Sequence, residues 1–430
     1  MRPRRQGGST ALPLLRLPGS ALGLPEGVMS AASVEAALAS ERRTRQRTGP
    51  LPDIPAISLN PFREGTEEGK RRVAAEWDRA CREVGFIKIV DHGVPKEVIE
   101  RCWSATEAFF ERPIGEKLAV KMTDDYPYGY NAMGGENLLA SLDKDAETPG
   151  DLKEMFNVCL GSDTPAADHP PPKWPVNAER EQAAYGAYSR ALAGLADTLY
   201  RVCALALHLD EEWFVPKNTQ HRDVVRAIHY PAQKPPSVPK PGQVRASMHT
   251  DYGALTILRL GGAFPGGLQV MGATGTWIDV STTDEEDAFV INLGDLMARW
   301  TNDRWMSTPH QVRRHNERQS EGAPSHRPAT TATASSADGC QLTALRPHPL
   351  QVVNPPSEVA AMARRISIAY FCNVNMDAMV ECIPTCVGEH GAKYEPIAAG
   401  EWLMRKHSQT QQGQLCYRKA ATPSKKPPEA

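Results

Sequence analysis

Residues 248–253 read Met-His-Thr-Asp-Tyr-Gly, and this stretch decides which fold the rest of the chain is expected to form. On an extended strand, residues two positions apart point to the same side, so His249 and Asp251 would share a face. An imidazole beside a carboxylate is half of a site for a divalent metal. A His-x-Asp pattern alone is common and more often marks a turn or a surface pair, so other segments have to support the metal.

A third ligand has to come from a distant part of the chain, and the segment Trp305–His310 offers His310. Two histidines and one carboxylate cover one face of an octahedron and leave the other face open. That arrangement suits Fe(II) and leaves room for a chelating co-substrate and O2. The sequence therefore predicts an iron site made by His249, Asp251 and His310, with no further catalytic side chain beyond the metal centre.

The segment Arg-Ile-Ser at 365–367 places Arg365 and Ser367 on one face of an otherwise apolar strand, with Ile366 on the other. An arginine in such a core needs an anionic partner, and its fork binds a carboxylate through two hydrogen bonds. A nearby hydroxyl adds one more. Beside an iron site this pair predicts an anchor for a dicarboxylate co-substrate. The alternative is a buried ion pair between arginine and an acidic residue.

The elements around these motifs predict an α+β fold with helices first and strands afterwards. Helical spacing of apolar residues predicts helices from Thr66 to Gly85, from Lys96 to Phe110 and around Tyr188–Leu209. Short strands separated by glycine and proline follow, which is typical of a sandwich or jelly roll. These strands are expected at 254–260, 267–271, 277–280, 288–293 and 366–371.

The composition fits a globular protein without a nucleic-acid or membrane partner. Hydrophobic residues make up 41% and charged residues 23% of the 430 residues, and the net charge is −2. No apolar run reaches the roughly 18 residues needed to cross a bilayer. Nine cysteines without a CxxC pair indicate free thiols in a reducing compartment. We therefore expect a cytoplasmic protein, a small-molecule substrate and a monomeric state.

Two segments look foreign to the folded core. Residues 1–50 begin with a basic, acid-poor stretch that is typical of an organelle-targeting leader; a 5′ extension with the true start at Met29 is the alternative. Residues 312–351 are rich in Ser, Thr, Pro, Ala and Arg, and a structureless loop of that length is unexpected inside a compact β domain. Val and Gln codons at its ends can supply the GT and AG of an intron, so a retained intron is predicted. A genuine surface insertion is the alternative.

These observations divide the chain into consecutive parts. They are a disordered leader (1–50), a helix-rich N-terminal region (51–165), connecting helices (166–221), a catalytic core interrupted by the insert 312–351 (222–376), and a C-terminal segment with a disordered tail (377–430).

With these motifs in order, the chain resembles the isopenicillin N synthase-like group of Fe(II)/2-oxoglutarate-dependent dioxygenases. The resemblance rests on IPAISL, ACREVGFIKIVDHGVP, GDLKEMF, MHTDYGALTIL, GGLQV, TWIDV, FVINLGDLMARWTND, STPH and RISIAYF, which occur in the expected order. It implies a double-stranded β-helix, or jelly roll, with flanking N-terminal helices. It also implies a role in secondary metabolism.

By the same resemblance, His249, Asp251 and His310 match the iron ligands, and Arg365 and Ser367 match the pair that grips 2-oxoglutarate. Tyr230 matches a tyrosine that lines the co-substrate pocket. The implied reaction uses Fe(II), 2-oxoglutarate and O2 to hydroxylate or desaturate a small organic metabolite, releasing succinate and CO2.

The chain departs from the family pattern in places. Plant members often carry Asn where this chain has Ile228, and the residue after the distal histidine is usually Arg, where this chain has Gln311. The insert follows His310 closely and, if translated, is expected to disturb it. Two alternatives therefore stay open: a related Fe(II) oxidase that uses no 2-oxoglutarate, and an inactive, metal-free scaffold.

Overall fold

The computed structural model describes nine stretches of the chain. They are residues 54–123, 126–141, 149–160, 171–232, 243–261, 267–272, 275–280, 287–312 and 364–408. The predicted leader, all but the first residue of the predicted insert, and the C-terminal tail therefore lie outside the described residues.

The described helices alternate with short strands and turns. The helices are α2 (Asn60–Arg63), α3 (Glu67–Glu83), α4 (Lys96–Glu111), α5 (Ile114–Ala119), α6 (Glu179–Ala206), α7 (Asp295–Trp300) and α9 (Ala399–His407), with 3₁₀ turns η1 (Leu138–Ser141), η2 (Val215–Lys217) and η4 (Pro384–Cys386). The strands are β1 (Ala56–Ser58), β2 (Phe86–Val90), β3 (Gly129–Asn131), β4 (Glu154–Cys159), β5 (Val224–Tyr230), β6 (Ala246–His249), β7 (Leu255–Gly261), β8 (Leu268–Met271), β9 (Trp277–Asp279), β10 (Phe289–Leu293), β11 (His310–Val312), β12 (Arg365–Cys372), β13 (Met379–Val380) and β14 (Ile397–Ala398).

Two main sheets make up the β part. One has the strand order β1-β2-β10-β7-β12-β5-β4-β3 and the other has the order β6-β11-β8-β9. From β5 to β12 the chain passes repeatedly from one sheet to the other, which is the connectivity of a jelly roll. Apolar residues of both sheets, such as Val290, Val270 and Val312, form a shared core between them. The predicted α+β class with a double-stranded β-helix core is confirmed.

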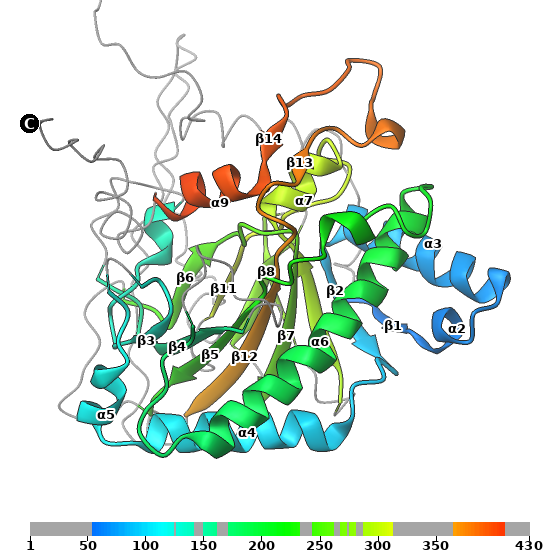
Figure 1. Ribbon diagram of the computed structural model, residues 1–430. Helices are drawn as coiled ribbons and strands as arrows, with labels where there is room; N and C mark the ends of the chain where they lie inside the picture. Colours follow the sequence, from blue (N-terminus) through cyan, green and yellow to red (C-terminus); the bar gives the residue numbers. More distant parts are fainter. Residues whose placement is uncertain are drawn as a thin grey trace, which may run out of the picture. The chain divides into compact units, whose positions relative to one another are not determined.

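The helices cover the other face of the larger sheet. Figure 1 shows α4 and α6 lying across this sheet. Their buried side chains pack in one cluster with strand residues that include Ile368 and Tyr370 of β12. The alternate residues of β12, Arg365 and Ser367 among them, line a cavity on the opposite face. Alternate side chains of β12 therefore pack in the core and line the cavity, as its sequence pattern predicted.

The N-terminal helix α3 follows its sequence signals closely. The Thr66 hydroxyl accepts a hydrogen bond from the backbone of Gly69, which caps the first turn, and Glu67 and Glu68 lie at the positive end of the helix dipole. The chain leaves the helix at Gly85, where φ is +73°. A side chain there would overlap Met306 and Thr308, so glycine allows the segment before His310 to lie against the end of this helix.

The prediction of the long helix was less accurate than that of α3. Its apolar run suggested residues 188–209, whereas α6 spans Glu179–Ala206. The first turns carry Glu179 and Glu181 and few large apolar groups, so hydrophobic spacing alone did not reveal them. Among the described helices, none combines the length and the apolar character that a membrane crossing requires.

Candidate metal centre

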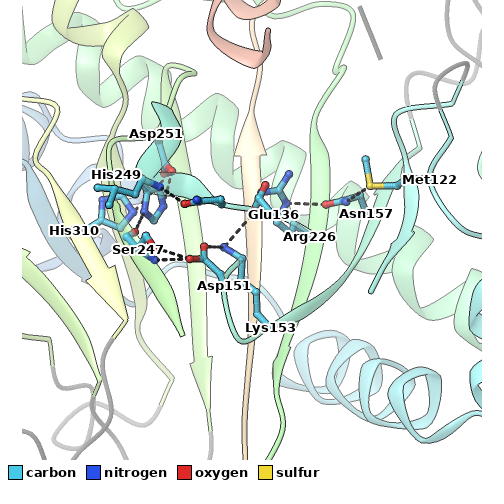
Figure 2. A network of polar contacts seen from close by, with 12 residues as sticks. Met122, Glu136, Asp151, Lys153, Asn157, Arg226, Ser247, His249, Asp251 and His310 are labelled. Atoms are coloured by element: carbon cyan, nitrogen blue, oxygen red, sulfur yellow. Dashed lines mark hydrogen bonds and ion pairs between the residues drawn. The ribbon is translucent and has the colours of Figure 1, made fainter. Parts of the chain in front are cut away.

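His249, Asp251 and His310 come together at one end of the smaller sheet. His249 ends β6 and His310 begins β11, and the two residues are direct partners across this antiparallel ladder. One donor atom from each of the three residues lies within 4.8 Å of the other two. The Asp251 Oδ1 atom is 3.9 Å from His249 Nε2 and 3.8 Å from His310 Nε2. Figure 2 shows the three side chains pointing toward one another.

His249 and Asp251 were expected to share one strand, and this expectation was wrong. Asp251 does not lie on the same strand as His249, because β6 ends at His249. The carboxylate is placed by the turn that follows, where the backbone oxygen of Asp251 accepts a hydrogen bond of 2.8 Å from the amide of Asp295. Gly294 passes so close to the backbone of this turn that a side chain there would collide with it.

Both imidazoles are oriented through their Nδ1 atoms. His249 Nδ1 lies 2.7 Å from the carbonyl oxygen of Ser247, and His310 Nδ1 lies 3.1 Å from that of Thr308. A carbonyl can only accept, so each Nδ1 carries the proton and each Nε2 presents a lone pair to the other donors. Thr308 is itself held, since its hydroxyl donates to the carbonyl of Val84 at 2.6 Å.

Asp251 is fixed in the same manner. Its Oδ2 atom accepts hydrogen bonds of 2.6 Å from Thr256 and Asn292, which leaves Oδ1 facing the imidazoles. Burial would raise the pKa of Asp251, but the two histidines and these donors outweigh burial and lower it. Burial and His310 lower the pKa of His249 to about 3. A carboxylate and a neutral imidazole are the protonation states that a metal ligand needs, so the donor set fits Fe(II).

A cavity of about 310 Å³ opens beside the three donors. At one end it is lined by Arg365, Ser367 and Tyr230, the residues expected to hold a co-substrate. Arg365 and Tyr230 face each other across β12 and β5, and the guanidinium lies 5.6 Å from the centre of the Tyr230 ring. Ile228, which replaces the asparagine of many plant sequences, lines the cavity between this end and the middle.

The opposite end of the cavity has a different character. Arg226 lies there with its Nε donating to Asn157 at 2.7 Å and its guanidinium 5.2 Å from the centre of the Phe371 ring. A strand rises about 3.3 Å per residue, so Phe371 lies roughly 20 Å from Arg365 along β12. Tyr252 and, from helix α9, His407 also line the cavity.

Of the three tyrosines at positions 126, 128 and 130, one lines the cavity. Tyr128 lines the cavity, whereas Tyr126 donates to the carbonyl of Pro171 and Tyr130 donates to Glu154. Met133 is exposed. Tyr126 and Tyr130 therefore bond within the protein and do not line the cavity.

Several lining or supporting residues were not predicted. Thr256 and Asn292 are polar residues inside apolar strands, a signal that could have found them. Arg226 alternates with Ile228 and Tyr230 on β5, and the same period-two argument would have placed it in the cavity.

Two family models match this chain. Residues 54–177 match the N-terminal domain described as non-haem dioxygenase in morphine synthesis. Residues 222–323 match the 2OG-Fe(II) oxygenase superfamily. The second match includes the three candidate iron ligands and ends before Arg365 and Ser367, so the assignment of those two rests on their place in the cavity.

Curated relatives agree with these models. The chain is 27% identical over 382 residues to the 2-oxoglutarate-Fe(II) type oxidoreductase hxnY of Emericella nidulans, covering 85% of this chain and 92% of the relative. It is 31% identical over 286 residues to the 2-oxoglutarate-dependent dioxygenase tropC of Talaromyces stipitatus, covering 60% and 81%.

A similar structure has also been solved. It is a full-length Neurospora crassa protein in complex with alpha-KG, which is 2-oxoglutarate, and thymine. The TM-score is 0.62 and the identity 28%, with 83% of this chain and 96% of that protein covered.

Proposed function

Because this chain belongs to the 2OG-Fe(II) oxygenase superfamily, we propose that His249, Asp251 and His310 hold its catalytic Fe(II). The protein is a 2-oxoglutarate-dependent dioxygenase. The observation that carries the ligand assignment is the cluster of three oriented donors beside a cavity. Bound iron supplies the oxidising chemistry, with 2-oxoglutarate and O2 consumed and succinate and CO2 released.

The end of the cavity at Arg365 is proposed to hold 2-oxoglutarate. The buried guanidinium of Arg365 would grip the distal carboxylate, and the hydroxyls of Ser367 and Tyr230 would donate to it. All three lie on the paired strands β12 and β5, in the lining of the same cavity as the three metal-binding candidates. This anchor, together with the relatives named for 2-oxoglutarate, supports this co-substrate over an oxidase that draws electrons elsewhere.

The opposite end is proposed to hold a small organic substrate. The rings of Phe371 and Tyr252 offer flat apolar faces, and Arg226 and Asn157 offer hydrogen bonds at the edge. Such walls suit a compact ring with polar substituents, and the similar Neurospora crassa protein binds thymine. The side chains here would orient the substrate and exclude water.

The decisive experiment is an anaerobic titration of the purified protein with Fe(II) and 2-oxoglutarate. We expect a visible metal-to-ligand charge-transfer band to form, followed on oxygenation by succinate in proportion to O2 consumed. Succinate release would then be compared with and without thymine and a panel of small ring compounds. Absence of the band at saturating iron would remove the proposal and favour the metal-free scaffold.

One prediction concerns the substrate end. Phe371→Ala is expected to raise KM for the organic substrate about fivefold, because an aromatic contact contributes about 1 kcal/mol beyond its buried area. The affinity for 2-oxoglutarate should stay unchanged, since Phe371 lies at the other end of β12. KM for substrate and Kd for 2-oxoglutarate would be measured on the same preparation.

The neighbouring Tyr370 provides the matched control. Its ring packs among the helices on the opposite face and its hydroxyl donates to Asp223 at 2.7 Å. Tyr370→Phe should lower stability and leave both constants unchanged. An equal rise of KM in the two variants would show that Phe371 acts through folding and not through substrate contact.

A second prediction concerns residues 312–351. We expect a protein lacking them to bind Fe(II) at least as tightly as the full chain, because deletion joins Gln311 to Val352 and keeps a valine at the last position of β11. That position pairs with Leu268, so the ladder that carries His310 is preserved. Iron titration and thermal melts of both proteins test this. Loss of iron binding in the shortened protein alone would show that the segment belongs to the fold.

The protein is further proposed to act as a cytoplasmic monomer. The described cysteines are free thiols, most of them buried, which fits a reducing compartment. Light scattering on the purified chain and imaging of a C-terminal fusion test the two parts of this proposal.

A further inference from the structure

We propose that Asp151 is a positioning residue for the iron ligand His249, and that buried Lys153 and Glu136 hold Asp151 in place. This inference rests on the proposed role of His249 as an iron ligand. It assigns a role to the segment Gly150–Phe156, which is one of the motifs that carry the family resemblance and has no role in the reaction proposed above.

The strand that carries His249 is poorly supported by its own sheet. Among the described strands, β6 lies at the edge of its sheet and pairs with β11 alone, and the register between β6 and β11 shifts between His310 and Val312. An edge strand leaves backbone groups without ladder partners, and a register shift loosens the pairing that remains. The position of His249 therefore depends on contacts from outside the ladder.

Asp151 provides such contacts to Ser247, which lies two residues before His249 on β6. Its Oδ1 atom accepts a hydrogen bond of 2.6 Å from the Ser247 hydroxyl and another of 3.2 Å from the Ser247 backbone amide. The carboxylate thus accepts a backbone hydrogen bond of the kind that a neighbouring strand would accept. The backbone amide of Leu152 adds a hydrogen bond of 2.8 Å to the carbonyl of Val244, just before the strand begins.

The contact reaches the imidazole in one further step. The carbonyl of the same Ser247 accepts the proton of His249 Nδ1 at 2.7 Å. If Ser247 shifts, the ring of His249 rotates and its Nε2 lone pair turns away from Asp251 Oδ1. Partners that orient a metal-bound histidine commonly set its affinity for the metal.

Asp151 itself is held by buried charges. Its Oδ2 atom lies 3.0 Å from Lys153 Nζ, which lies 2.9 Å from Glu136 Oε2. Their side chains are nearly inaccessible, with exposed fractions of 1%, 3% and 7% for Asp151, Lys153 and Glu136. Burial favours the neutral forms, but the pairing lowers the pKa of Glu136 to about 2 and raises that of Lys153. Glu136 and Lys153 are therefore charged at neutral pH, and removal of either one leaves the other without its buried partner.

The network also continues toward the substrate end. Glu136 Oε1 lies 3.5 Å from Arg226, which donates to Asn157. Figure 2 shows the unbroken series from the histidines through Ser247, Asp151, Lys153 and Glu136 to Arg226. The edge strand with the iron ligand is thereby tied to strands β4 and β5 of the larger sheet.

The test compares Asp151→Ala with Glu154→Ala. Glu154 belongs to the same segment but faces the helices, where it forms a similar buried ion pair of 2.9 Å with Lys117. Both variants should lose stability. Asp151→Ala should also weaken Fe(II) binding by roughly 10- to 100-fold, the usual effect of losing an outer partner of a metal ligand. Kd for Fe(II) would be measured anaerobically by competition with a chelator, and stability by thermal melts.

Smaller changes at Ser247 test the same contact in case Asp151→Ala does not fold. Ser247→Ala removes the hydroxyl donor and is expected to raise Kd for Fe(II) by a smaller factor, whereas Ser247→Thr keeps a hydroxyl and should restore most of the affinity. Equal iron affinity in the wild type, Asp151→Ala and Ser247→Ala would overturn the inference. Failure of the wild type to bind Fe(II) would instead overturn the proposed function.

Discussion

Asp251→Ala is expected to abolish Fe(II) binding and 2-oxoglutarate turnover. Asp251 is the single carboxylate of the donor cluster, and its Oδ1 atom faces both imidazoles. Without it two neutral nitrogen ligands remain, and the negative charge that balances Fe(II) is lost. The affinity for Fe(II) should fall by more than the roughly 100-fold that is lost when a residue that only orients a metal ligand is removed. Anaerobic titration should show no charge-transfer band, and succinate should stay at the level of a protein-free control.

A nearby carboxylate serves as the control. Asp295 accepts a hydrogen bond of 3.1 Å from the Thr250 hydroxyl and pairs with Lys406 at 2.5 Å, but it is not part of the donor cluster. Asp295→Asn should lose some stability and still form the band. A band of full intensity in Asp251→Ala would contradict the ligand assignment, and its loss in both variants would point to a general disturbance of this turn.

The sequence was most informative where chemistry and strand periodicity coincide. His249, Asp251 and His310 were recognisable because few other functions need two histidines and a carboxylate in that order. Their closeness could not be calculated from spacing, since it depends on the pairing of β6 with β11 and on the turn that holds Asp251. The reasoning about strand alternation selected two residues that the structure brings together, although Asp251 lies beyond the end of the strand.

Residues whose roles depend on tertiary contacts could not be predicted from the sequence. Glu136, Asp151 and Lys153 lie in or beside a loop whose sequence shows no period, and their pairing exists only once that loop packs against β6. His407 reaches the cavity from α9, which is far in sequence from the strands that form the other walls. A sequence pattern can indicate that such charges are unusual, but it cannot indicate which of them will be buried together.

Arg365→Gln is expected to raise Kd for 2-oxoglutarate by on the order of 100-fold or more, because loss of one partner of a buried charge pair costs about 2–5 kcal/mol. The buried guanidinium of Arg365 lines that end of the cavity together with Ser367 and Tyr230. Arg365→Lys keeps the charge but loses the bidentate geometry. Its Kd for 2-oxoglutarate should therefore lie between those of the wild type and Arg365→Gln. Iron binding measured without co-substrate should be unchanged, which separates this variant from Asp251→Ala.

Arg364 is the matched control for this test, since it is adjacent in sequence and carries the same charge. Its side chain is 40% exposed and pairs with Glu111 at 3.2 Å, while its Nε atom lies 3.1 Å from His229. Arg364→Gln should therefore leave Kd for 2-oxoglutarate unchanged. If Arg365→Gln bound 2-oxoglutarate as the wild type does, this arginine would be a structural residue of β12, and the co-substrate would have to be held at another part of the cavity. A rise in Kd for Arg365→Gln alone would place the distal carboxylate of 2-oxoglutarate beside Tyr230, about four residues along β5 from Arg226 and the proposed substrate end.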